Sequence, residues 1–242
     1  MIDIIQVLDV LGFISNSINS PIMKCVAIVP IKLNNRRLPG KNTRAFTNGN
    51  PLCTYILNTL MSNKRISEVY VYCSNEEIKQ YLPKGVLFLK RPGFLDDDDH
   101  NISDILDEFT RVVDADIYVQ THATAPFISN ESLDKGLDAV IIDHHDSAFS
   151  VKKIQDFIWV DGKPWNFDKT NIPRTQDLKP IYLETSGFYI FTKDVFLKYH
   201  SRVGNEPKYI EVPEFESIDI DELSDFEMAD AIYNYSLMKA GR

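Results

Sequence analysis

The chain has 242 residues, of which 44% are hydrophobic and 25% are charged, so it can bury a substantial core and suits one large domain. This composition argues against an intrinsically disordered chain. The formal net charge of −9 argues against a general nucleic-acid-binding protein, because such proteins usually neutralise phosphates with a basic surface.

Membrane insertion and secretion find no support in the sequence. No apolar run approaches the roughly 18 residues that a spanning helix needs, and Asp3 and Asp9 stand where a secretory signal would carry Lys or Arg. The odd number of cysteines, without the spacing of a zinc site, favours buried reduced thiols at Cys25, Cys53 and Cys73. We expect a cytoplasmic protein with neither a nucleic-acid nor a membrane partner.

Residues 1–22 precede the first predicted strand and place Ile4, Ile5, Leu8 and Leu11 on one helical face. This N-terminal extension is either a consequence of an upstream start codon or a helix that docks on a partner, and both interpretations stay open. A single domain is expected over residues 23–242.

The first half of this domain alternates strand and helix patterns. An apolar run at residues 25–31 predicts a buried strand, and a helix follows from about Pro51. The next elements are strands at 68–73, 86–90 and 116–121, with helices after Asn75, over 103–113 and after Ser129. The alternation predicts an α/β fold with a doubly wound, mostly parallel sheet.

The pattern changes from about residue 147. Residues 157–167 alternate aromatic and polar side chains around Asp161-Gly162, a two-residue hairpin turn. We interpret about 152–180 as an inserted segment. The remaining predicted elements are a strand at 181–191, a helix at 193–199 and a closing helix from Leu223, where Ser224 and Glu227 have capping-box spacing.

A basic segment lies in this acidic protein. No Asp or Glu occurs between Lys24 and Ser67, a stretch that also contains Lys32, Arg36, Arg37, Lys41, Arg44, Lys64 and Arg65. Its central loop follows the first strand, where open α/β sheets bind ligands, so it can surround a triphosphate. The Walker spacing is absent, so side chains must supply the positive charge.

This loop resembles the signature of the acylneuraminate cytidylyltransferase family, which is written Pro-Ala-Arg, two variable residues, Ser-Lys, two variable residues, Pro, one variable residue, Lys-Asn. Four positions agree: Pro30, Pro39, Lys41 and Asn42. Four others differ: Ile31, Lys32, Asn35 and Arg36 stand where the family has Ala, Arg, Ser and Lys. Positive charge is kept at each phosphate-binding position.

Two later segments extend the resemblance. Residues 124–127 are similar to the family's Gln-Pro-Thr-Ser-Pro-Leu-Arg segment, but His122 replaces its Gln and Ile128 its Arg. Residues 217–221 are similar to its Asp-Ile-Asp motif, and strand alternation would place Asp219 and Asp221 on one face, where two carboxylates can hold Mg²⁺ against phosphates. Further landmarks are Arg91, residues 173–176 and residues 186–189, so the resemblance spans about 26–231.

The resemblance implies a fold of the nucleotide-diphospho-sugar transferase type and transfer of CMP from CTP to an acidic sugar, a sialic acid or related nonulosonate, with release of pyrophosphate. It implies a homodimer joined through the inserted segment and Mg²⁺ or another divalent cation. The resemblance implies that nucleotide is bound by Pro30, Lys32, Asn35, Arg36, Lys41, Asn42 and Arg91. It implies that the acceptor is bound by His122, Thr124, Arg174 and Gln176. The implied metal ligands are Asp219 and Asp221, and the implied catalytic residues are Lys41, Asp219 and Asp221.

Several alternatives remain open. The changes at His122 and Ile128 allow a different acceptor, such as a diamino nonulosonate, a ketodeoxyoctonate or a phosphorylated small molecule. A non-catalytic nucleotide-binding relative is another class, and a metal-dependent glycosyltransferase a third, although the basic loop disfavours it. Arg91 could equally form a salt bridge, and the acidic run at 96–99 is interpreted as a solvated loop without a role.

Overall fold

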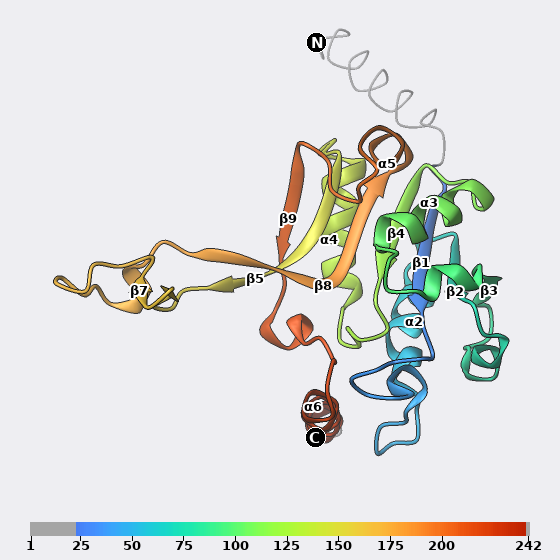
Figure 1. Ribbon diagram of the computed structural model, residues 1–242, viewed down its shortest axis with the longest axis horizontal. Coiled ribbons are helices and arrows are strands. Elements are labelled where there is room, and N and C mark those ends of the chain that lie inside the picture. The colour runs from blue at the N-terminus through green and yellow to red at the C-terminus, as the bar shows by residue number, and fades with distance from the viewer. Residues whose placement is uncertain (1–22, 241–242) are drawn as a thin grey trace, which may run out of the picture.

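The computed structural model describes residues 23–240, so the interpretations of residues 1–22 lie outside the described part. Seven strands form one sheet in the order β3-β2-β1-β4-β8-β5-β9, with a separate pair β6-β7 (Figure 1).

The strands are β1 Cys25–Ile31, β2 Glu68–Cys73, β3 Leu87–Lys90, β4 Ile117–Thr121, β5 Ser147–Ile154, β6 Trp159–Val160, β7 Lys163–Pro164, β8 Ile181–Thr192 and β9 Pro207–Glu211. The α-helices are α2 Leu52–Ser62, α3 Ile102–Val112, α4 Asn130–Ile141, α5 Lys193–Tyr199 and α6 Leu223–Ala240. Short 3-10 helices cover Lys41–Thr43, Glu76–Tyr81, Gly93–Asp96, Thr175–Asp177 and Glu214–Ser217.

The predicted mostly parallel sheet is confirmed. Strands β3, β2, β1 and β4 pair in parallel, as do β5 and β9, whereas β8 runs antiparallel to both of its neighbours. Its register pairs Phe188 with Thr121, the last residue of β4. The middle of β8 therefore lies beside the carboxyl end of β4, where ligands of such sheets bind.

Helices cover both faces of the sheet because each has one apolar face. On one side α2 and α4 bury Ile56 and Leu137 in the larger core cluster. On the other side α3 and α5 bury Phe109 and Phe196. A third cluster joins Phe226 of α6 to α2 and to the loop after β1, and α6 lies at the same end of the sheet as that loop (Figure 1).

Two helix starts differ in detail from the sequence prediction. Asn75 caps as predicted, accepting from the backbone N–H of Glu77, but the helix that it begins is a 3-10 helix. The predicted capping box at Ser224 and Glu227 is wrong, because α6 already begins at Leu223. The Asp225 carboxylate instead accepts from the N–H groups of Asp221 and Glu222. This contact fixes the start of α6 against the acidic motif.

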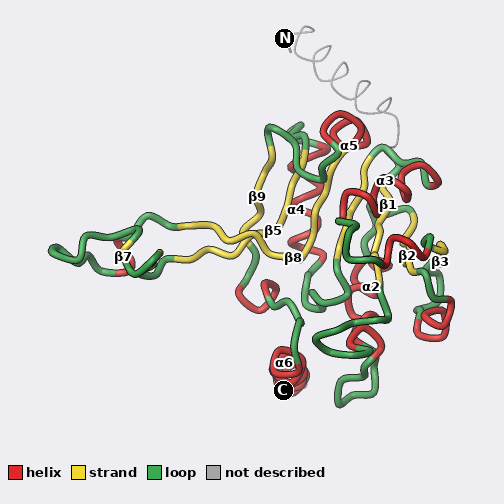
Figure 2. Tube along the Cα trace, viewed as in Figure 1, coloured by secondary structure: helices red, strands yellow, loops and turns green. Residues whose placement is uncertain are grey.

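The inserted segment forms an arm that projects from the sheet. Strands β5 and β8 continue past the sheet edge, and residues 155–180 form the far end of the arm (Figure 1), most of it loop (Figure 2). The predicted hairpin turn is confirmed, with φ of 49° at Asp161 and 72° at Gly162 between β6 and β7. Trp159 and Trp165 are 56% and 60% exposed on the arm. Across residues 23–240, no helix combines the length and apolarity required to cross a membrane.

Gly136 lets α4 approach the sheet closely. A Cβ at this position would lie 2.7 Å from Cδ1 of Ile190 and 2.9 Å from the Phe188 ring, both on β8. We expect Gly136→Val to lower the free energy of unfolding by about 1–3 kcal/mol through overpacking. Lys135→Val, on the exposed face of α4, is the control and should cost under about 1 kcal/mol. Urea denaturation measures both, and equal losses would contradict this account of the packing.

Candidate active site

Three segments meet at the carboxyl edge of the sheet: the loop at 32–42 after β1, the turn after β4 and the segment at 217–221 before α6. The N–H of Ile220 donates to the Thr124 carbonyl at 2.9 Å, and the Ile220 side chain is fully buried. Ile220, the central residue, therefore anchors the motif, and Asp219 and Asp221 flank it in the chain. The prediction that it forms a sheet strand is wrong, since residues 218–221 have no regular secondary structure and Ile220 pairs with the turn after β4.

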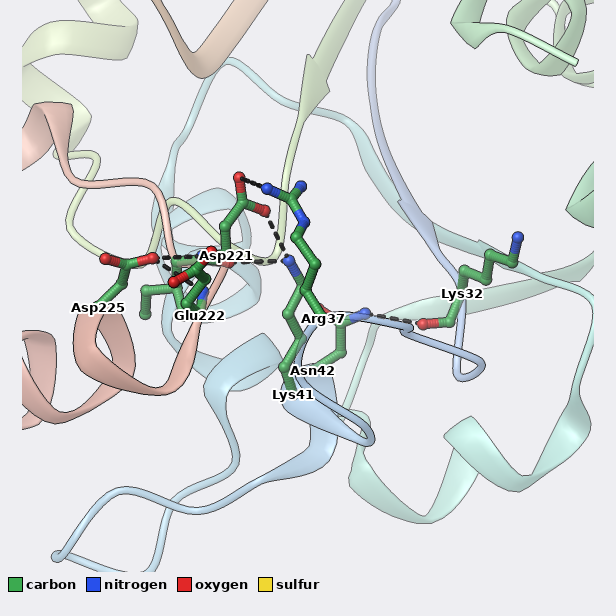
Figure 3. Close-up of polar contacts among 8 residues, drawn as sticks. Lys32, Arg37, Lys41, Asn42, Asp221, Glu222 and Asp225 are labelled. Atoms are coloured by element: carbon green, nitrogen blue, oxygen red, sulfur yellow. Dashed lines mark hydrogen bonds and ion pairs between the residues drawn. The ribbon is translucent and has the colours of Figure 1, made fainter. Parts of the chain in front are cut away.

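Lys41 joins the basic loop to this motif. Its side chain is only 11% exposed, and Nζ donates to the Ile220 carbonyl at 2.8 Å and to Oδ1 of Asp221 at 3.0 Å. Arg37 binds the other oxygen of Asp221 at 2.8 Å, so two cations hold one carboxylate (Figure 3). Within the loop, the Asn42 side chain donates to the Lys32 carbonyl at 2.9 Å. The predicted residues Lys41, Asn42 and Asp221 thus form one connected group.

The two aspartates of the motif have different surroundings. Burial raises the pKa of Asp221, but the hydrogen bond and charge of Lys41, together with Arg37, hold it below its ordinary value. Asp219 carries a buried oxygen, Oδ1, that has no hydrogen-bond partner. A free carboxylate oxygen is the ligand type that Mg²⁺ prefers, and this ion usually takes one or two carboxylates from the protein. No cluster of three or more His, Cys, Asp or Glu suited to a metal occurs among residues 23–240.

The acidic run at 96–99 is exposed at residues 97–99, as expected for a solvated loop, but Asp96 and Asp98 also contact the basic loop. Lys32 donates to the Asp96 carbonyl and lies 3.8 Å from Asp98, which also binds Arg36 at 2.6 Å. Arg91, only 3% exposed, pairs with the Asp96 carboxylate. Between the loop and this acidic run lies a cavity of about 540 Å³. An anion that enters it must replace the aspartates as partner of the cations.

Buried polar atoms without a hydrogen-bond partner gather in the same region. Five such side-chain atoms occur in the described residues: Asn35 Oδ1, Asn42 Oδ1, Arg91 Nε, Thr121 Oγ1 and Asp219 Oδ1. Four of the five belong to residues predicted for the site, and Thr121 ends β4 beside it. Because native proteins pair nearly all buried polar groups, this concentration indicates a place where a polar ligand completes the bonding.

The predicted acceptor side is only partly assembled within one chain. His122 is half-buried at the end of β4, with Nε2 at 2.8 Å from Nε2 of Gln120. Ile128 is 1% exposed in the core, so its difference from the family pattern does not reach the site surface. Arg174 and Gln176 are exposed on the arm, and Arg174 pairs with Asp177 at 2.7 Å. The chain itself does not bring these two residues to His122.

A residue that no motif indicated lies beside His122. Arg202, between α5 and β9, stacks on Tyr189 with its guanidinium carbon 3.4 Å from the ring centroid, and it donates to Oε1 of Gln120 at 2.5 Å. Burial, then the charges of Arg202 and Lys41, lower the pKa of His122 to about 4. His122 is therefore neutral near pH 7 and can accept at Nε2 from the Gln120 amide.

Comparison with known proteins assigns the class. The sequence profile described as Cytidylyltransferase matches residues 26–234, and the chain belongs to this family of nucleotidyltransferases. The N-acylneuraminate cytidylyltransferase of Oncorhynchus mykiss is 26% identical over 214 residues, covering 84% of this chain and 49% of the relative. The pseudaminic acid cytidylyltransferase of Campylobacter jejuni is 23% identical over 231 residues, covering 87% and 97%. The chain thus spans about half the length of the first relative and nearly all of the second.

Solved structures share the fold at lower identity. A CMP:2-keto-3-deoxy-manno-octonic acid synthetase complexed with CTP has a TM-score of 0.66 at 19% identity, covering 88% of this chain and 99% of that one. The 4-diphosphocytidyl-2C-methyl-D-erythritol synthase of Anaerococcus prevotii has a TM-score of 0.62 at 14% identity, covering 88% and 97%. These likenesses confirm the expected nucleotide-diphospho-sugar transferase type of sheet.

The lowered pKa of His122 predicts a pH dependence of stability. An unfolded histidine titrates near pH 6.5, so as the pH falls the unfolded chain takes up this proton first. The stability contributed by neutral His122 is present in full above about pH 6.5 and is lost as the pH falls toward about 4. We expect the unfolding temperature to fall more between pH 7.5 and pH 5 in the unmodified protein than in His122→Gln, which does not titrate. Equal decreases would show that other groups carry the dependence.

Proposed function

We propose that the protein transfers CMP from CTP to an acidic sugar, a sialic acid or related nonulosonate, and releases pyrophosphate. The relatives named for N-acylneuraminate and pseudaminic acid support this acceptor class. The observation that carries the proposal is the contact of Lys41 with Ile220 and Asp221, because it joins a basic loop to an acidic motif at the ligand-binding edge of the sheet. The reaction suits the cytoplasm, where CTP is made.

The basic loop supplies the charge that a triphosphate needs. Lys32 and Arg36 line the cavity, and Lys41 lines an adjoining pocket that these two cations also border. The unpaired amide oxygens of Asn35 and Asn42 lie in the same loop. In the proposed step an acceptor hydroxyl oxygen gives up its proton to solvent water and forms a bond to the α-phosphorus, while the bond from that phosphorus to the oxygen that bridges it to the β-phosphorus breaks. The electron pair leaves with pyrophosphate, and the nearby cations stabilise its charge.

A divalent cation such as Mg²⁺ fits the two aspartates. Asp219 offers a buried unpaired oxygen, and Asp221 is kept ionised by its cationic partners. When bound, the ion would neutralise phosphate charge and favour departure of pyrophosphate. Lys41 would orient the Asp221 carboxylate and keep the motif next to the phosphates.

We further propose a homodimer joined through the arm. Its exposed Trp159 and Trp165 suit an interface, since aromatic residues are enriched there. Such a dimer would give Arg174 and Gln176, which extend away from their own chain's site, a route to the site of a second copy. A different acid sugar remains the second candidate acceptor, because the synthetase for 2-keto-3-deoxy-manno-octonic acid shares the fold and His122 departs from the sialic acid pattern.

Pyrophosphate release tests the reaction. We expect release only when CTP and Mg²⁺ are combined with one acid among N-acetylneuraminate, pseudaminic acid and 3-deoxy-manno-octulosonate; ATP, GTP and UTP serve as controls. 2C-Methylerythritol 4-phosphate tests the phosphorylated acceptor. No release with any acid, while CTP still raises the unfolding temperature, would favour a binding-only relative and contradict the proposal.

Asp219→Asn tests the metal ligand. The substitution keeps the shape but removes the charge, so kcat should fall at least about 100-fold, since a lost metal contact is worth several kcal/mol. The unfolding temperature should change little. Glu222→Gln is the matched control, because this neighbouring acid is exposed at the start of α6. A kcat near normal for Asp219→Asn at saturating Mg²⁺ would remove Asp219 from the site.

A further inference from the structure

Arg202 is a half-buried cation held in a defined orientation. Its guanidinium stacks on Tyr189 and donates to Gln120, and these residues come from adjacent strands, β8 and β4. A planar guanidinium has five N–H donors, of which the contact to Gln120 uses one. Residues 23–240 place no carboxylate within ion-pair distance of it. The nearby acid Glu184 accepts instead from the Tyr189 hydroxyl.

The position of Arg202 relates it to the proposed reaction centre. Gln120 contacts Arg202 through its oxygen and His122 through its nitrogen, so the three side chains form a continuous row. The charges of Arg202, Lys41 and Asp221 all act on the His122 ring, so all three groups lie near it. The Asp219 charge likewise acts on Tyr189. Arg202 is thus connected through Gln120 to His122, the predicted acceptor-binding residue at the end of β4.

A purely structural role does not account for this arrangement. The segment that carries Arg202 is already fixed at the start of β5 by other bonds. Gly204 N–H donates to the Ser147 hydroxyl at 2.9 Å, and the N–H groups of Asn205 and Glu206 donate to the Asp146 carboxylate at 2.6 and 2.9 Å. The Asn205 side chain also donates to the Tyr199 hydroxyl at 2.8 Å. The partly buried charge is therefore not needed to hold the segment.

We propose that Arg202 binds the carboxylate of the acid sugar acceptor, with Gln120 and Tyr189 fixing its guanidinium. This inference rests on the proposed function and adds a specificity-determining residue that the chain supplies to its own site. A guanidinium presents two parallel N–H groups to a carboxylate, which gives both affinity and orientation. Arg174, the arginine that the family resemblance implies for acceptor binding, is exposed on the arm and already pairs with Asp177.

The test compares an acid with its methyl ester. The probe is whichever acid of the panel the unmodified protein converts, and pyrophosphate release is measured at saturating CTP and Mg²⁺. Arg202→Met should raise the acceptor KM roughly 10- to 100-fold, the range expected for lost hydrogen bonds to a charged group. The KM for CTP should stay within about twofold. The methyl ester should be a poor substrate for the unmodified protein, and Arg202→Met should not raise the KM for the ester any further.

Two further variants make the test specific. Arg202→Lys keeps the positive charge but lacks the two parallel N–H donors of the guanidinium. Its preference for acid over ester should lie between those of the unmodified protein and Arg202→Met. This variant also tests the inference if Arg202→Met does not fold. Arg174→Met should retain the full preference. The CTP-induced rise in unfolding temperature reports whether each variant keeps the nucleotide site.

Each remaining outcome decides against the inference. Equal losses for acid and ester in Arg202→Met would indicate a structural role, and a raised KM for CTP would place Arg202 on the triphosphate. Loss of the acid preference in Arg174→Met alone would assign the carboxylate to the arm. If the unmodified protein converts no acid, both the proposed function and this inference are wrong. If the unmodified protein converts an acid, and both Arg202 variants keep the same preference for acid over ester, only this inference is wrong.

Discussion

The contact between Lys41 and the segment at Ile220 and Asp221 organises the functional end of the molecule. It joins residues 179 and 180 positions apart and brings a loop that follows the first strand against the start of the last helix. Without it, a positive loop and a negative motif would each face solvent at the same sheet edge. With it, the aspartate charge is held in place by Lys41 and Arg37, and the backbone of the motif is fixed from both sides.

The sheet, the arm and the main residues of the site could be predicted because their signals are local. Strand and helix periodicity gave the alternating order, Asp161-Gly162 gave the hairpin, and the loop around Lys41 and the Asp219 motif carried the resemblance to the family. The direction of β8 could not be predicted, since an apolar strand pattern is the same in both directions. The acidic motif departed from a sheet strand because Ile220 binds a turn instead of a neighbouring strand.

The contacts that could not be predicted join residues that are far apart in the sequence and have no recognisable pattern around them. Arg202 meets Gln120 across 82 positions, and neither residue belongs to a motif. Asp96 and Asp98 appeared to be a solvated run because four consecutive aspartates usually are, and only the folded chain places them opposite Lys32 and Arg36. Ile128 was interpreted as a change that could affect the choice of acceptor, but its side chain lies in the core.

The pairing of Asp98 with the basic loop has a consequence for how an anion enters. Lys32 and Arg36 share the single carboxylate of Asp98, so an incoming phosphate meets two cations that are partly neutralised and displaces that carboxylate when it binds them. The net affinity is then the difference between two electrostatic interactions, and a singly charged anion gains little by displacing a carboxylate. Such a built-in competitor favours ligands that carry several charges and would let the loop re-form its internal pairs as a multiply charged product departs.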